Sequence, residues 1–148
     1  MKWKTIVIAL VVLVPLRTGL ANVDLGDGSA RNSPYAAFTV LIESGKYEQA
    51  VKRIESALKD NPNDADLLNF LAFSHRKLQH YQVALKYYLE ALNLEPEHLG
   101  ANEYLGELYL QLGQLEKARE RLDVLDKACL FGCEEYDELK AAISDYQL

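Results

Sequence analysis

GKYEQA at residues 45–50 and GQLEKA at residues 113–118 are the two stretches that decide how this chain folds. Their separation is two periods of 34 residues, and further residues recur at that period. Apolar, small and proline positions all take part: Ala50, Ala84 and Ala118; Ala57 and Ala91; Pro62 and Pro96; Leu71 and Leu105; and Tyr47, Tyr81 and Leu115. Because a whole set of positions shares one offset, the chain contains an internal repeat.

The period and the two stretches resemble the tetratricopeptide repeat, whose unit has small residues in its second helix and a proline at its end. On this chain the repeats fall at about residues 31–64, 65–98 and 99–132. The resemblance implies an all-α superhelix of three helix hairpins. Helical spacing of apolar residues agrees with it, and Pro62 and Pro96 are expected to end second helices. We also expect Gly106 and Ala118 to let the two helices of the third repeat approach closely.

The third repeat departs from the pattern at its end, where Leu130 stands in place of the proline. Beyond it, Tyr136, Leu139 and Ile143 continue the apolar positions of a first helix, while Lys140 replaces the small residue. A lysine fits there if no second helix follows. Residues 134–146 are therefore predicted to form a capping helix, which brings the expected number of helices to seven.

The first residues have the order of a secretory signal peptide: Lys2 and Lys4, an apolar run over residues 5–16, then small residues up to Ala21. A membrane anchor is the alternative, but a span needs ~20 apolar residues. We predict that residues 1–21 are removed, that residues 22–32 form a flexible leader, and that residues 33–148 form the repeat domain. The expected location is the periplasm of a bacterium, or outside the cell.

The net charge of the chain restricts the classes of partner that it can bind. The formal net charge is -6, and loss of residues 1–21 removes three basic side chains and no acidic ones. Such an acidic body repels nucleic acid and anionic membrane surfaces. No glycine-rich phosphate loop, nucleophile elbow or zinc-protease motif is present, and the three histidines lack metal-ligand spacing. We expect another protein as partner, no membrane insertion after cleavage, no cofactor or metal, and no enzyme activity.

In the family that the chain resembles, the first helices line a concave groove that holds a peptide or a helix of a partner. The corresponding residues here are Asn32, Tyr35, Thr39, Ile42, Asn69, Phe73, Arg76, Lys77, Glu103, Glu107, Leu110 and Gln111. Phe73 is the expected anchor, because a large apolar side chain at a groove position has no core to fill. The alternative is that Phe73 packs against Tyr35 or the leader. Glutamates occupy the third helix where the family's carboxylate clamp needs cations.

Cys129 and Cys133 are the second candidate site. In an oxidising compartment they are expected to form a disulfide; metal or redox chemistry, or free thiols, are the alternatives. Residues four apart on a continuous helix hold their Cβ atoms too far apart for the bond, so the helix must end there, and Gly132 allows the turn. Three functions follow: a protein-binding module, a thiol-dependent metal or redox accessory protein, and a structural subunit of a larger assembly.

Overall fold

A computed structural model describes residues 33–146, which fold into α-helices and contain no strand. Seven helices follow one another in this part of the chain: α1 (Ala36–Glu43), α2 (Tyr47–Asp60), α3 (Ala65–Lys77), α4 (Tyr81–Leu94), α5 (Leu99–Gln111), α6 (Leu115–Ala128) and α7 (Glu134–Tyr146). The predicted signal peptide and leader, residues 1–32, lie outside the described residues. None of these helices is long and apolar enough to span a membrane.

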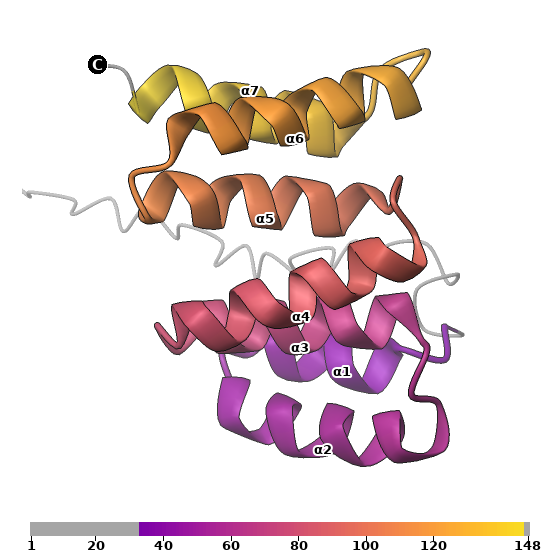
Figure 1. Cartoon of the computed structure of the whole chain (residues 1–148). Helices are drawn as coiled ribbons and strands as arrows, with labels where there is room; N and C mark the ends of the chain where they lie inside the picture. Colours follow the sequence, from indigo (N-terminus) through magenta and orange to yellow (C-terminus); the bar gives the residue numbers. More distant parts are fainter. Residues whose placement is uncertain (1–32, 147–148) are drawn as a thin grey trace, which may run out of the picture.

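The helices form three hairpins, α1 with α2, α3 with α4 and α5 with α6, and α7 closes the array. Figure 1 shows the hairpins stacked in chain order, with α2 at one end and α6 and α7 at the other. Neighbouring hairpins touch through α2 and α3 and through α4 and α5. This is the predicted all-α solenoid.

The three turns inside the hairpins share one backbone conformation. Gly45 and Gly113 occupy it with positive φ angles of 69° and 73°, which glycine adopts without strain. In the second hairpin Gln79 takes the same place with a φ of 62°. It is the one residue other than glycine with positive φ in the described part of the chain, and its Cβ makes that conformation costly.

The helix ends follow the proline positions. Helices α2 and α4 stop two residues before Pro62 and Pro96, as expected, and a capped first helix follows each proline. The Asp64 carboxylate accepts a hydrogen bond from the Leu67 N–H at 2.9 Å, which caps α3. At the matching place His98 caps α5 by accepting from the backbone of the third residue on.

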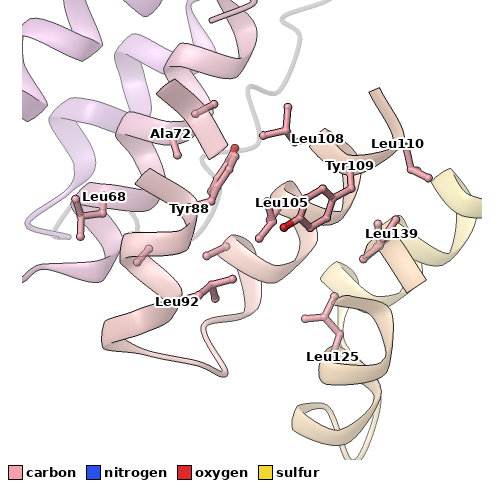
Figure 2. Packing of buried hydrophobic residues seen from close by; sticks show 14 of the residues in the cluster. Leu68, Ala72, Tyr88, Leu92, Leu105, Leu108, Tyr109, Leu110, Leu125 and Leu139 are labelled. Carbon is pink, nitrogen blue, oxygen red and sulfur yellow. The ribbon is translucent and has the colours of Figure 1, made fainter. Parts of the chain in front are cut away.

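The larger of two hydrophobic clusters extends from α3 to α7 and is the reason why the hairpins stack. Tyr88 of α4 is fully buried in it, near Ala72 of α3 and Leu105 of α5 (Figure 2). A smaller cluster around Ile54 and Leu71 joins α2 to α3. Since residues of several helices bury one another, no single hairpin covers its own apolar face.

Helix α7 docks on α5 at Gly106. A Cβ atom at this position would lie 2.5 Å from Leu139 Cδ2, which is closer than real contacts allow. Gly106 was expected to bring α5 and α6 together; the structure shows that its missing side chain makes room for Leu139 of α7. Lys140 is exposed, as expected for a residue with no further helix to pack against.

Candidate binding groove

The first helices of the three hairpins line a hollow with a volume of about 410 Å³. Its lining residues come mainly from α1, α3 and α5: Thr39, Ile42, Glu43, Tyr47, Phe70, Phe73, Lys77 and Tyr104. Thr39, Ile42, Phe73 and Lys77 belong to the groove predicted from the sequence. The hollow therefore collects predicted residues of the first and second repeats.

Two aromatic rings form the wall of this hollow. The ring centres of Phe73 and Tyr104 lie 4.8 Å apart with their planes at 59°, a favourable tilted arrangement. The Lys77 ammonium group lies 5.0 Å from the centre of the Phe73 ring and is exposed. Phe73 is only half-buried, so it packs on Tyr104 and keeps surface open to the hollow. It does not pair with Tyr35, whose ring lies beside Phe70 instead.

The burial of Arg76 differs from the prediction. It was predicted as a groove cation, but the residue is only 5% exposed. Its guanidinium forms an ion pair with the Glu107 carboxylate and lies 5.3 Å and 5.6 Å from the ring centres of Phe73 and Tyr104. Arg76 is therefore used inside the protein, where it supports the two rings, and Lys77 remains the exposed cation of the hollow.

Asn69 and Glu103 are likewise buried rather than presented to solvent, at 5% and 2% exposure. Burial raises the pKa of Glu103 to about 9, helped by a hydrogen bond with Glu138 and by the negative charges of Glu107 and Glu135. Two of these carboxyl groups belong to α7, so the capping helix covers this part of α5. The groove prediction for the third repeat did not take that cover into account.

Tyr35 and Thr39 fix the start of α1. The Tyr35 hydroxyl donates a hydrogen bond to Asp64 Oδ2 at 3.0 Å, and the Thr39 hydroxyl donates to the Tyr35 carbonyl at 3.2 Å. Burial raises the pKa of Tyr35 to about 12, with the Asp64 carboxylate as the next cause. Asp64 also caps α3, so one carboxylate joins the first two repeats. Asn32 lies outside the described residues.

Sequence reasoning missed Phe70 and Tyr104, both of which line the hollow. The two aromatic residues are one 34-residue period apart. That shared offset was a usable signal, because it places both side chains at the same position of consecutive first helices. Burial raises the pKa of Tyr104 to about 12, and the nearby carboxyl groups of Glu103, Glu138 and Glu107 contribute.

The cysteines lie away from this hollow, in the turn between α6 and α7. Helix α6 ends at Ala128 and Gly132 has a φ of 85°, so the chain turns between the sulfurs as the disulfide prediction requires. The sulfur atoms of Cys129 and Cys133 are 2.07 Å apart, which is a disulfide distance. While bonded, neither sulfur is a thiolate ligand. No group of three or more potential metal ligands occurs among residues 33–146.

Known structures share this architecture. The translocator chaperone SycD of Yersinia enterocolitica superposes with a TM-score of 0.68 at 18% identity, over 76% of this chain and 80% of its own. The second TPR domain of human RPAP3, in complex with an HSP70 peptide, gives 0.65 at 20% identity, over 76% of this chain and 90% of that domain. The TPR domain of Sgt2 from Aspergillus fumigatus gives 0.68 at 17% identity, over 82% and 83%. These likenesses show the fold.

Sequence relatives and family models agree. Human protein O-mannosyl-transferase TMTC3 is 35% identical over 65 residues, which is 44% of this chain but 7% of that protein. The uncharacterized protein ycf37 of Guillardia theta is 29% identical over 91 residues, or 58% of this chain and 51% of that protein. This chain thus spans only part of either relative. Two models described as tetratricopeptide repeat match residues 35–72 and 75–143. With its repeat period and helix hairpins, this chain belongs to the tetratricopeptide repeat family.

Proposed function

We propose that this protein is a non-catalytic interaction module that binds an extended segment or a helix of another protein in the hollow formed by α1, α3 and α5. The observation that carries the proposal is the pair of Phe73 and Tyr104, which form an aromatic wall beside an exposed lysine. Half-buried aromatic side chains next to charge are frequent binding anchors. The hollow's volume of about 410 Å³ is within the ~300–1,000 Å³ range of ligand sites.

Similar folds support this proposal. TPR domains of RPAP3 have been solved with HSP70 and HSP90 peptides, and SycD with a peptide of the translocator YopD. Identity to this chain is 19% to 21% in these cases, so they support the kind of function and not a particular partner.

The binding experiment needs a ligand, which can be selected from a random peptide library displayed on phage against the full chain. Phe73→Ala should weaken the binding of the selected peptides about thirtyfold, since truncating such an anchor costs ~2 kcal/mol or more. Val83→Ala is the matched control, because Val83 is an exposed apolar residue of α4, outside the hollow. Fluorescence anisotropy measures both affinities.

Folding must be separated from binding in this experiment. Leu71 is 1% exposed, so Leu71→Ala should destabilise the domain by ~2–5 kcal/mol, whereas Phe73→Ala should remain folded. Equal binding by the wild type and Phe73→Ala would overturn the proposal. So would a loss of stability in Phe73→Ala as large as that in Leu71→Ala, because Phe73 would then belong to the core.

We further propose that the protein works after export, in the periplasm or outside the cell. The support is the order of basic, apolar and small residues in positions 1–21. Mass spectrometry of the native protein should find a mature chain that begins at Asn22. An intact amino terminus in the membrane fraction would contradict export with cleavage.

A further inference from the structure

We propose that two copies of this protein associate through a reciprocal contact, in which each copy inserts Leu130 and Phe131 into an apolar pocket on α4 of the other. We call residues 129–133, between α6 and α7, the disulfide loop, and the pocket on α4 the outer pocket. The inference is independent of the proposed function, because the loop and this pocket both lie outside the hollow formed by α1, α3 and α5.

The disulfide loop presents two large apolar side chains to solvent. Phe131 is fully exposed and Leu130 is 81% exposed, so the rest of residues 33–146 leaves both uncovered. Single exposed apolar residues are common on protein surfaces, but adjacent ones form a patch, and apolar patches mark interaction sites. The bond between Cys129 and Cys133 closes the loop around them. Because this ring restricts the backbone, the loop loses little conformational entropy when it binds.

The outer pocket is an apolar depression that can receive these side chains. Its volume is about 630 Å³, which exceeds that of the hollow. Its apolar lining residues are Pro62, Leu68, Leu85, Leu89 and Leu94. Leu68 is buried, whereas Leu89 and Leu94 are 48% and 40% exposed. A phenylalanine and a leucine side chain together are smaller than the drug-sized ligands that pockets of ~300–1,000 Å³ hold.

The loop and the pocket of one copy do not meet. The pocket extends from the turn after α2 to the end of α4, and the loop follows α6, so both lie along the edge where the second helices end (Figure 1). Helix α5 lies between α4 and α6, and the disulfide keeps the loop too short to reach across it. Another molecule must therefore fill the pocket, and a second copy brings the uncovered apolar pair. A two-fold axis between loop and pocket lets both contacts form at once.

The area of the contact favours the reciprocal arrangement. Full burial of an aromatic side chain removes ~150–250 Å², so Phe131 and Leu130 together offer about 300–400 Å². With a similar area lost from the pocket, one contact buries roughly 600–800 Å², which is the size of a non-specific packing contact. Two symmetric contacts bury about 1,200–1,600 Å², the size of a specific interface.

Charged side chains around the two surfaces also favour this contact. The exposed residues next to the loop in sequence are Asp126, Lys127 and Glu134, and the first turn of α7 adds further carboxylates. Lys86 lines the outer pocket and pairs with Glu90 at 3.8 Å through exposed side chains. Such exposed pairs contribute little to stability. Lys86 is therefore available to the acidic side chains beside the loop of a second copy.

Sedimentation velocity of the exported, non-reduced protein tests the association. Between about 1 and 100 μM the wild type should show a monomer–dimer equilibrium. Phe131→Ser and Leu89→Gln should each raise the dissociation constant about a thousandfold, since a loss of about thirtyfold at each contact occurs twice in the dimer. Val40→Gln is the matched control, because Val40 is an exposed apolar residue of α1 that does not line the pocket. All three variants should keep the circular dichroism of the wild type.

Mixing two variants tests whether the loop faces the pocket. In an equimolar mixture of Phe131→Ser and Leu89→Gln, the intact loop of the second variant can enter the intact pocket of the first. The mixture should associate about thirtyfold more tightly than either variant alone, because both substitutions then fall in the same one of the two contacts. A mixture that associates no better than its components would overturn the inference.

Three further results would contradict the reciprocal dimer. Association that needs Leu89 but not Phe131 would mean that the α4 faces pack on each other, without the loop. Species larger than a dimer would overturn the two-fold arrangement. A wild type that is monomeric at every concentration would overturn the inference, and if it bound phosphatidylcholine vesicles through Phe131, the loop would belong to a lipid surface instead.

Discussion

Glu103→Gln is expected to stabilise this protein at neutral pH and to have little effect in acid. Glutamine keeps the shape of the side chain but carries no charge. In the folded protein the pKa of Glu103 is raised from 4.5 to about 9, mainly by burial. At pH 7 the folded state therefore holds a proton that the unfolded chain has released. The 2.5 pH units between the ordinary pKa of 4.5 and pH 7 correspond to about 3 kcal/mol, by which protonation of Glu103 lowers the stability of the wild type. The glutamine variant does not have this cost.

The sign of this stability difference follows from the number of protons that the folded and unfolded states bind at Glu103. Below pH 4.5 both states are protonated at this site, so wild type and variant should be equally stable. Between pH 4.5 and about 9 the folded state binds more protons than the unfolded chain, and the wild type loses stability as pH rises. The stability gap should thus open from near zero at pH 4.5 to about 3 kcal/mol at pH 7.

Urea unfolding followed by circular dichroism at a series of pH values measures this gap. Taking the difference between the two proteins removes the contributions of titrating groups that do not interact with Glu103. A gap that stays constant with pH, or a variant less stable than the wild type at pH 7, would refute the reasoning. Glu103 would then be ionised and paired in the folded protein.

Three more predictions concern the helix contacts and turns outside the groove. Gly106→Ala should destabilise the domain by ~1–3 kcal/mol in thermal or urea unfolding, because its Cβ would collide with Leu139, and Leu139→Ala should remove most of that extra cost in the double variant. Gln79→Gly should raise the free energy of unfolding by roughly 0.5 kcal/mol, since it relieves the positive φ; a loss of stability would show that this turn is not strained. Thiol titration of the exported, non-reduced protein should find neither Cys129 nor Cys133 free, and reduction should loosen α7 without unfolding the rest; two titratable thiols would favour the metal or redox alternative.

The repeat made the fold predictable. A 34-residue offset fixes where each turn and each helix falls, so all seven helices of the described residues, including the capping helix, could be placed from the sequence. The same offset also reveals Gln79, which lies one period from both Gly45 and Gly113. The 34-residue offset therefore predicts the features that recur from one repeat to the next.

The charges of the groove were less predictable because the pairings that decide them do not recur. Whether Arg76 is exposed depends on Glu107, which lies on a different helix and has no counterpart in the period. Glu103 is buried because α7 covers α5. The position of α7 on α5 is set by the contact between Leu139 and Gly106. Such pairings between distant residues decide burial and charge, and sequence position alone does not show them.

Nuclear magnetic resonance of the full chain with a selected peptide tests the central claim most directly. If the partner occupies the hollow, the ring signals of Phe73 and Tyr104 and the amide signals around Thr39 and Lys77 should shift as peptide is added. Shifts confined to the outer face of α4, around the exposed Val83, with both rings unchanged, would contradict the account.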